Sequence, residues 1–496
     1  MPIVDVSTLD TGARTMKLLR TAVTMGVLVA LTTVVPASAS PAPSWQRAKQ
    51  AALPKGAQGL PQGYLPTLSC VSPGNCEAGG AATVGGGVQG FVLNESNGAW
   101  TAPVTLKAPT DAAKGTGVTI YGLSCGALGN CAAVGSYSDR RANVQAFVAN
   151  EVRGRWSPAT KVALPANALA SGQNALVRSV SCRSLGNCSA VGDYQDNTPV
   201  TSRTVGFVMS EVRARWRPAR EFTTVSAPNV NPFVAMNQIA CASSANCVAV
   251  GSFIDANDVT QALVEREDHG TWSRAFSLSL PANASVYAGA SVTEVTCVVH
   301  SACTVLGTYN ASTGKVEAMS ATEHGGVWSR ASELTMPANA GANPRVFLYG
   351  FNGVACASAG NCSVGGQYVD STGAYQGFLD SEVGGTWSSA VELSLPSGAT
   401  SAGKNGGVIA LTCPNAGNCR AGAAYLDAAG NYQALVVSEV NGAWQVGQTV
   451  VLPGSATTVG VDGGIYSLVC GTTSSCTGTG SFLSNATTYE GFTITS

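Results

Sequence analysis

Alternating apolar and polar residues predict short β-strands along most of the chain. Each stretch of about 57 residues contains four such strands, named a, b, c and d in chain order. Examples, taken from different repeats, are strand a at residues 174–182, strand b at residues 188–194, strand c at residues 145–148 and strand d at residues 387–395. They are separated by Gly, Pro, Asn and Ser, which favour turns. The pattern therefore predicts an all-β protein.

Strand d is the most regular of the four. It begins at a Trp, and in residues 387–395 Trp387, Val391, Leu393 and Leu395 have the same parity, which predicts a strand with one buried face. A Pro follows nine residues after the Trp in seven of eight copies. Proline lacks the N–H that a ladder needs, so it should end the strand.

Cysteine marks each repeat. All 16 cysteines fall into pairs with five residues between them, and successive pairs start 55 to 59 residues apart. This spacing suits a four-stranded propeller blade and is too long for an ankyrin or leucine-rich repeat. The pairs are Cys70 and Cys76, Cys125 and Cys131, Cys182 and Cys188, Cys241 and Cys247, Cys297 and Cys303, Cys356 and Cys362, Cys413 and Cys419, and Cys470 and Cys476.

The ends of the chain predict how the repeats close. Residues 44–53 carry a strand d pattern with no strand a, b or c before them, and residues 491–496 stop where a c-to-d turn should begin. We therefore predict an eight-bladed β-propeller over residues 40–496, whose last blade is completed by the strand near Trp45. A β-solenoid or a chain of small sandwiches is the alternative. The blade tryptophans are Trp45, Trp100, Trp156, Trp216, Trp272, Trp328, Trp387 and Trp444.

The amino terminus resembles a secretory signal peptide in its composition. A basic start at Met16-Lys-Leu-Leu-Arg20 precedes an apolar run over residues 21–35 and the small residues Ala37-Ser38-Ala39. We expect translation to begin at Met16 and cleavage after Ala39, so that residues 1–39 are removed. A retained anchor is the weaker alternative, because the run is shorter than the roughly 20 residues that span a bilayer. The expected product is secreted and extracellular, without a transmembrane anchor.

Export and local pairing favour disulfides for the cysteines. Zinc sites generally need four close ligands, and the chain has only three His. Each bridge closes a short loop and should contribute only about 2 kcal/mol. With a net charge of -1 and scattered Lys and Arg, nothing favours nucleic acid as a partner. We expect a monomer with no cofactor and no metal.

A Glu stands five residues before seven of the tryptophans. General acid–base chemistry needs one or two carboxylates in a distinctive environment, whereas these positions are equivalent. We predict instead that each Glu accepts backbone N–H groups in the c-to-d turn, and that a Gly two residues before Trp supplies positive φ, with Ala214 as the exception. No catalytic residue is predicted. The glutamates are Glu95, Glu151, Glu211, Glu267, Glu323, Glu382 and Glu439.

This turn resembles the Asp box of sialidase-like propellers. Glu382, Gly384, Thr386 and Trp387 match the box S-x-D-x-G-x-T-W, with Glu for Asp; the Ser of the box is absent, and most copies move Gly one place toward Trp. In that family the box is a fold element remote from the catalytic centre, so the resemblance implies a propeller and no activity. The whole repeat also resembles that of secreted, disulfide-bearing propeller proteins of high-GC Gram-positive bacteria.

Two further groups of polar residues are predicted to be structural. His269, His300 and His324 stand at non-equivalent points of different blades, which favours exposed turn residues over a shared site. In five blades an Asp lies two residues after the aromatic of strand b, and turn capping is favoured over Ca²⁺ binding because separate blades keep these carboxylates apart. These are Asp139, Asp196, Asp255, Asp370 and Asp427.

Recognition is expected at the face that carries the b-to-c and d-to-a connections. Loop length varies there, for example at residues 193–203, at residues 337–349 and before Pro228, and variable loops on a rigid scaffold often bind ligands. The leading hypothesis is a scaffold that binds a glycan or protein partner at a cell surface. The alternative is a glycan-active hydrolase or lyase at the channel mouth, which should show clustered Arg, Tyr and carboxylates there.

Overall fold

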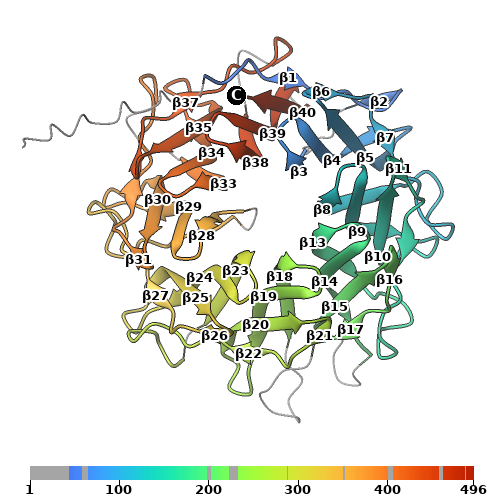
Figure 1. Ribbon diagram of the computed structural model, residues 1–496, viewed down its shortest axis with the longest axis horizontal. Coiled ribbons are helices and arrows are strands. Elements are labelled where there is room, and N and C mark those ends of the chain that lie inside the picture. Colours follow the sequence, from blue (N-terminus) through green and yellow to red (C-terminus); the bar gives the residue numbers. More distant parts are fainter. Residues whose placement is uncertain are drawn as a thin grey trace, which may run out of the picture. The chain divides into compact units, whose positions relative to one another are not determined.

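Eight antiparallel sheets make up the part of the chain that the computed structural model describes, which is residues 44–58, 65–197, 203–222, 233–287, 289–349, 352–399, 406–456, 462–485 and 488–496. Figure 1 shows the sheets as blades around a common centre. Within those ranges no residue forms a helix, so none offers a helix that could span a membrane. The predicted all-β, eight-bladed propeller is confirmed. The predicted signal peptide and the insertion before Pro228 lie outside the described residues.

Each blade runs outward from strand a to strand d. The innermost strands a are β3 (Thr67–Ser72), β8 (Val118–Ala127), β13 (Leu176–Ser184), β18 (Val234–Ser243), β23 (Ala290–Val299), β28 (Val354–Ser358), β33 (Gly407–Asn415) and β38 (Gly464–Thr472). Strands b are β4 (Asn75–Val84), β9 (Asn130–Ser138), β14 (Asn187–Gln195), β19 (Asn246–Ile254), β24 (Ala302–Asn310), β29 (Asn361–Val369), β34 (Asn418–Leu426) and β39 (Ser475–Asn485). Strands c are β5 (Gly87–Ser96), β10 (Val144–Val152), β15 (Thr204–Val212), β20 (Thr260–Asp268), β25 (Val316–His324), β30 (Tyr375–Val383), β35 (Tyr432–Val440) and β40 (Thr488–Thr495).

Strand d is split into two short segments in seven blades. The first segments are β6 (Ala99–Trp100), β11 (Arg155–Trp156), β16 (Arg215–Trp216), β21 (Thr271–Trp272), β26 (Val327–Trp328), β31 (Thr386–Trp387) and β36 (Ala443–Trp444). The second segments are β7 (Val104–Thr105), β12 (Thr160–Lys161), β17 (Arg220–Glu221), β22 (Phe276–Ser277), β27 (Ser332–Glu333), β32 (Val391–Glu392) and β37 (Gln448–Thr449).

The predicted continuous strand d with one buried face is therefore wrong in detail. Trp387 pairs with Glu382, but the next segment pairs Val391 with Leu379, which leaves one extra residue on strand d between the two pairings. An extra residue interrupts the alternation of side chains between the two faces of a sheet. Accordingly Val391 is 45% exposed whereas its neighbour Ala390 is buried, the reverse of the predicted alternation.

The hydrophobic core lies between neighbouring blades. A typical cluster joins Val134 and Val148 of the second blade to Val177, Tyr194 and Phe207 of the third. Both faces of an inner sheet are thus covered by other sheets, which explains why the b and c strands are almost continuously apolar and buried. This packing fixes the position of every strand around the centre.

The two remaining short strands lie on either side of the junction between the eighth and first blades. β2 (Ala57–Gln58) extends the first blade by pairing with β4. β1 (Lys49–Gln50) is the outer strand of the eighth sheet, where Lys49 pairs with Thr493 and Gln50 pairs with Phe492 of β40. The eighth blade therefore contains strands from both ends of the described chain.

All sixteen cysteines, which lie in the described part of the chain, form disulfides within their eight pairs. In the third blade, for example, Cys182 of β13 stands opposite Cys188 of β14. The bond therefore joins the two arms of the a-to-b hairpin next to its turn. Eight such turns form one face of the ring, which we call the disulfide face.

Candidate functional site

A β-bulge interrupts strand a in six blades and turns one side chain out of the regular alternation. The bulge lies in each case four residues before the first Cys of the repeat. Bulges are frequent beside active and binding sites because they re-aim a side chain. The bulged residues are Tyr121, Arg178, Asn237, Thr293, Ile409 and Tyr466.

Three of these bulged residues lie in the wall of a central cavity of about 310 Å³. Its wall comes from the innermost strands, and it includes Tyr121, Arg178 and Asn237, together with Asn352 at the equivalent position of the sixth blade. The cavity is therefore lined by residues of different chemistry at the position where the repeats differ. Cavities of this size are typical of small-ligand sites.

Arg178 is the only charged residue among the described residues that line this cavity, and its guanidinium is bound by the carboxylate of Asp193. Burial raises the pKa of Asp193, and the contact with Arg178 opposes that rise. The wall is thus close to electrically neutral. Its other polar groups are hydroxyls and amides.

Several of the hydroxyls in the wall also connect neighbouring blades. Ser69 accepts the backbone N–H of Cys125 at 2.9 Å, and Ser124 accepts that of Cys182 at 2.9 Å. Ser181 does the same for Cys241 at 3.0 Å. These serines have the same structural role in several blades, whereas the bulged residues differ between blades and are the stronger candidates for contact with a ligand. The bulged residues also have protein partners: Asn237 donates its amide to the carbonyl of Val292 at 2.7 Å, and Arg178 binds Asp193.

Three tyrosines lie close together at the end of the blades opposite the disulfide face, and one of them, Tyr466, directly precedes Ser467 of the cavity wall. Tyr432 begins strand β35, and Tyr349 precedes β28 and is 39% exposed. Burial and the nearby hydroxyls of Tyr432 and Tyr466 raise the pKa of Tyr349 to about 12, so its phenol stays protonated at neutral pH. We call Tyr349, Tyr432 and Tyr466 the tyrosine group.

Two neighbouring features extend this surface. The rings of Phe347 and Tyr375 lie 5.7 Å apart and are 44% and 38% exposed. Tyr489 donates its hydroxyl to the carboxylate of Asp462. The backbone of Asp462 forms an isolated parallel β-bridge with that of Tyr432. All of these residues belong to b-to-c or d-to-a connections or to the strand ends beside them, the face on which recognition was expected.

The predicted turn glutamates instead lie in the interfaces between blades. All seven are buried, with at most 5% of their surface exposed. Glu211 accepts the amide of Asn150 in the preceding blade, and Glu267 accepts the hydroxyls of Ser189 and Ser210 at 2.7 Å each. Side chains stand roughly perpendicular to a sheet, so a Glu at the end of strand c can face the preceding blade.

We predicted that each of these glutamates accepts hydrogen bonds from backbone N–H groups of its own c-to-d turn. The hydrogen bonds that the structure shows contradict this prediction. The one backbone donor is the N–H of Cys419, which reaches Glu439 at 3.2 Å from strand b and not from a turn. The paired tryptophans cross the same interface: the indole N–H of Trp216 reaches Asn150 at 2.9 Å, and that of Trp444 reaches Ser381 at 3.1 Å. Glu and Trp together connect each of these blades to its neighbour.

The glycines of this turn have the predicted conformation. Six of them have φ between 74° and 84°, and Ala214 adopts φ 60° at the seventh position. A two-residue hairpin with positive φ at both central residues matches the twist of its strands. The six glycines are Gly98, Gly154, Gly270, Gly326, Gly385 and Gly442.

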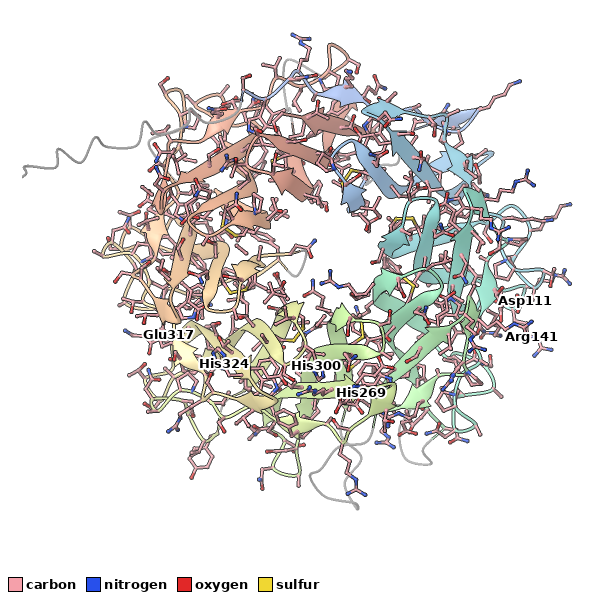
Figure 2. The ribbon with its side chains drawn as sticks, in the orientation of Figure 1. Asp111, Arg141, His269, His300, Glu317 and His324 are labelled. Carbon is pink, nitrogen blue, oxygen red and sulfur yellow. A yellow bond between two sulfur atoms is a disulfide. The ribbon has the colours of Figure 1, made fainter. Side chains whose placement is uncertain are left out.

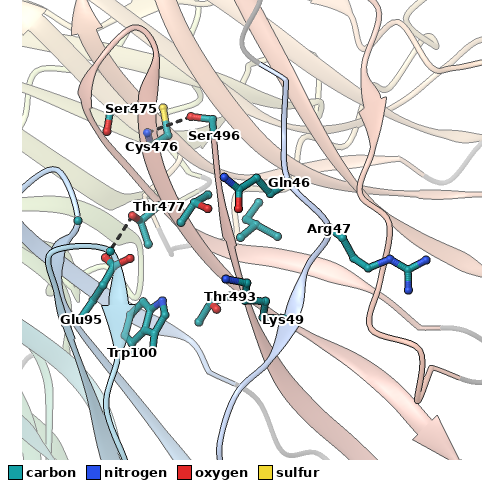
Figure 3. A pocket seen from close by; sticks show the side chains of 14 residues that line it. Gln46, Arg47, Lys49, Glu95, Trp100, Ser475, Cys476, Thr477, Thr493 and Ser496 are labelled. Atoms are coloured by element: carbon teal, nitrogen blue, oxygen red, sulfur yellow. Dashed lines mark hydrogen bonds between the residues drawn. The ribbon is translucent and has the colours of Figure 1, made fainter.

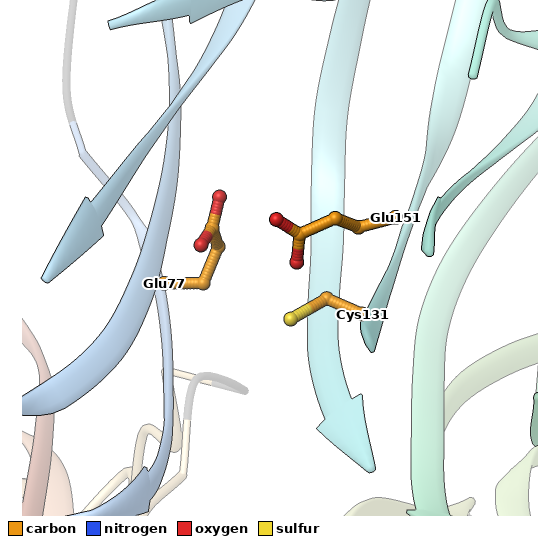
Figure 4. A group of neighbouring side chains, drawn as sticks. All are labelled: Glu77, Cys131 and Glu151. Atoms are coloured by element: carbon orange, nitrogen blue, oxygen red, sulfur yellow. The ribbon is translucent and has the colours of Figure 1, made fainter. Parts of the chain in front are cut away.

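One interface brings two carboxylates together. Figure 4 shows Glu77 of the first blade facing Glu151 of the second, beside Cys131. Burial and the proximity of Glu151 raise the pKa of Glu77 to about 8, and burial raises that of Glu151 to about 7. Cys131 is bonded to Cys125 and has no thiolate to offer a metal, so this group is a proton-binding carboxylate pair.

A second cavity, of about 240 Å³, lies where the eighth blade meets the first. Figure 3 shows Glu95 and Trp100 on one side, with Lys49 and Thr493 on the other. Thr477 donates to Glu95 at 3.4 Å, as the hydroxyls of other blades do to their glutamates. This cavity therefore belongs to the interface between the eighth and first blades, which is built like the interfaces between the other blades.

The aspartates after strand b cap their turns, as predicted. Asp370 accepts the backbone N–H groups of Thr372 and Ala374 at 2.8 and 3.0 Å, and the amide of Gln376 at 2.8 Å. Burial acts to raise the pKa of Asp370, but these hydrogen bonds and that from the Thr372 hydroxyl outweigh it and lower the pKa to about 2. Asp139, Asp255 and Asp427 have equivalent contacts, whereas Asp196 binds Arg203.

The prediction that the histidines are unrelated is wrong for two of them. The rings of His269 and His300 lie 5.7 Å apart although they belong to successive blades. A c-to-d turn and the next a-to-b turn are neighbours on the disulfide face, which the sequence positions alone did not indicate. Figure 2 places His324 apart from this pair.

No family model and no curated protein matches the sequence. Solved structures with some similarity include a polysaccharide lyase of family PL25, an ulvan lyase, with 10% identity over 74% of this chain and 90% of that chain and a TM-score of 0.42. A subtype N11 neuraminidase-like protein from a flat-faced bat isolate of Peru has 10% identity over 81% and 95% of the two chains, with a TM-score of 0.37.

The fucose-specific lectin from Aleuria aurantia has 14% identity over 70% of this chain and 99% of that chain, with a TM-score of 0.29. Such similarities are too low to assign an activity or a ligand. The class of the protein, a disulfide-bonded eight-bladed propeller, follows from its own sheets and bonds.

Proposed function

We propose that the protein is a secreted binding scaffold that takes an uncharged glycan of a cell surface at the central cavity and the tyrosine group beside it. The observation that carries this proposal is the bulge in strand a. It points side chains of differing chemistry into the cavity at one position of an otherwise uniform repeat.

The chemistry of the wall fits a polyhydroxylated ligand. Aromatic rings cover the apolar faces of sugar rings, while amides and hydroxyls such as those of Asn237 and Asn352 exchange hydrogen bonds with sugar hydroxyls. An anionic glycan would need an unpaired cation, but Arg178 is already bound by Asp193. The near neutrality of the wall therefore favours an uncharged sugar.

The protonation of the tyrosines supports binding over nucleophilic catalysis. A phenol whose pKa is raised remains neutral at pH 7 and donates a hydrogen bond. Burial raises the pKa of both Tyr349 and Tyr466. These residues are therefore suited to hold a ligand in place.

The test is a glycan array and a cell-wall pull-down with the exported protein, followed by calorimetric titration of the best ligand. Replacing Tyr121 or Asn237 by Ala should weaken binding about tenfold, because each removes a contact with the ligand worth roughly 1–2 kcal/mol. Val327→Ala is the matched control, because Val327 is 72% exposed in a c-to-d turn on the disulfide face.

Two results would contradict the proposal. One is the absence of retention on every glycan and cell-wall fraction. The other is time-dependent cleavage of the bound glycan, seen as new reducing ends or unsaturated products, which would establish a glycan-active enzyme.

A further inference from the structure

We propose a second binding site, at the junction between the second and third blades, which takes an acidic polysaccharide through Arg153, Arg213 and Arg217. Two cavities of about 410 Å³ and about 380 Å³ adjoin there, and Asn150 and Ala214 line both of them. The first cavity lies among the turns of the disulfide face, and the second lies along the outer strands. Together they form a groove, which we call the arginine groove.

The three arginines reach this groove from two blades. Arg153 lies in the c-to-d turn of the second blade, Arg213 lies at the same position in the third, and both line the first cavity. Arg217, directly after Trp216, lines the second cavity. The two turns are far apart in the sequence, so charges that are scattered along the chain meet at one junction of the ring.

These arginines are exposed, and no neighbour neutralises them. Among the described residues, no carboxylate lies within ion-pair distance of Arg153, Arg213 or Arg217, whereas Arg220 of the same blade is bound by Glu265. A guanidinium can hold a carboxylate or a sulfate through two parallel hydrogen bonds. The arginine groove therefore has the unpaired cations that the central cavity lacks.

The acidic residues in the wall do not cancel this charge. Glu151 and Glu211 are buried, and burial raises the pKa of each to about 7, so much of both stays protonated near neutral pH. Lys161 lines the second cavity as well, although its ammonium also lies 3.7 Å from the carboxylate of Asp111. The groove thus has an excess of positive charge, which attracts anions.

The other repeats show that the fold does not need this charge. In the five other c-to-d turns that join a Glu to a Trp, the four residues between them contain no Lys and no Arg. The arginines of the second and third blades are therefore a local feature of two neighbouring repeats. The residues that replace Arg153 and Arg213 in the other turns are Asn97, His269, Gly325, Gly384 and Asn441.

The backbone that carries the arginines is held in place. Asn130 accepts the backbone N–H of Arg153 at 3.1 Å, and the carbonyl of Gly186 accepts that of Ala214 at 2.9 Å. Binding therefore orders arginine side chains without reorganising the turns, which limits its entropic cost.

The shape and the apolar surface of the groove favour a sugar chain. The groove runs from the turns of the disulfide face to the outer strands, so a flexible chain can follow it, whereas a flat membrane cannot contact both parts at once. Half-buried Trp216 lines the outer part, and Val152 and Leu185, which are 43% and 56% exposed, line the inner part. Such surfaces cover the faces of sugar rings, while the arginines bind their acidic groups.

The test is calorimetric titration of oligogalacturonate, a chain of uronic acid sugars, into the exported protein, with a neutral dextran oligosaccharide of similar length as the control ligand. Saturable binding of the acidic chain alone is expected, and it should weaken as salt is added, because salt screens exposed charges. Arg153→Gln, Arg213→Gln and Arg217→Gln should each weaken the affinity by about three- to tenfold, since charged hydrogen bonds at exposed sites contribute modestly.

Arg274→Gln is the matched control, because Arg274 is an exposed arginine of the fourth blade that lines neither cavity. It removes the same charge and should leave the affinity unchanged. Tyr121→Ala, in the central cavity, should also leave it unchanged, which separates this site from the proposed function. Melting temperatures of the variants show whether a loss of binding reflects unfolding.

Four results would contradict the proposal. Oligogalacturonate does not bind, or Arg274→Gln weakens its binding as much as Arg153→Gln does. A loss of binding in Tyr121→Ala would place the acidic chain in the central cavity. Tighter binding of phosphatidylglycerol vesicles or of single-stranded DNA than of oligogalacturonate would assign the arginine groove to a membrane or to a nucleic acid.

Discussion

At the scale of single residues, the repeat makes one position stand out as unfavourable. Ala214 adopts φ 60° where six other blades have Gly. A left-handed conformation costs a residue with a Cβ roughly 1–2 kcal/mol, part of which is offset by the greater chain entropy of Gly. Ala214→Gly should therefore stabilise the protein by about 0.5–1 kcal/mol, measured by urea denaturation.

Gly154→Ala is the matched reverse substitution. A Cβ at Gly154 would contact no atom within 4 Å, so only its φ of 74° opposes the change. It should destabilise the protein by a similar amount. A destabilised Ala214→Gly variant would contradict this account of the turn.

The carboxylate pair between the first two blades predicts how stability depends on pH. The pKa of Glu77 rises from 4.5 to about 8 and that of Glu151 to about 7, because burial disfavours their charged forms. The folded protein therefore holds protons that the unfolded chain releases, and the free energy of unfolding should fall as the pH rises from about 4.5 to about 8. The pKa of Asp370 is lowered to about 2, so its protonation should lower the free energy of unfolding only below about pH 4.

Calorimetric melting at several pH values checks this dependence. Glu77→Gln keeps the shape of the side chain but cannot ionise, so its melting temperature should fall less between about pH 5 and pH 8 than that of the unmodified protein. An equal fall in both proteins would show that Glu77 does not bind this proton. The variant Glu221→Gln, on a partly exposed outer strand, serves as control.

At the scale of elements, the sequence predicted which strands exist better than how they are interrupted. The Cys pairs and the Gly turns made the a-to-b and c-to-d hairpins recognisable, and both are present. The bulge before Cys182 and the extra residue before Val391 depend on how a strand fits its partner, which no single strand encodes. The candidate site missed at the sequence level was therefore the bulged position.

A signal for that position did exist in the sequence. The residue four before the first Cys is of five different types in the seven blades from Tyr121 to Tyr466, while the Cys and the residues after it repeat closely. Variation inside a uniform repeat indicates a position that the fold does not constrain. The glutamates show the opposite case: equivalence in the sequence correctly indicated a structural role, but only the packed blades show that their partners lie across an interface.

At the scale of the whole molecule, the eighth blade depends on a strand from the opposite end of the chain. Gln46 donates its backbone N–H to Thr495 and Ala51 donates to Gly491, at 2.9 and 2.8 Å, on either side of the β1–β40 pairs. Ala48 is buried in a cluster with residues of the seventh and eighth blades, and Ala51 is buried in a cluster with residues of the first blade. The segment thus covers an edge strand that would otherwise expose its hydrogen-bonding groups.

Removal of residues 44–54 should therefore destabilise the entire ring and not only its seam. Each backbone hydrogen bond contributes roughly 1 kcal/mol, so loss of the segment should lower the free energy of unfolding by several times that amount, seen as a lower melting temperature. A synthetic peptide of residues 44–54 should restore the melting temperature, whereas a peptide with Ala48 and Ala51 replaced by Asp should not. Because closed rings share their stability among all blades, an unchanged melting temperature in the truncated protein would mean that the ring does not depend on this seam.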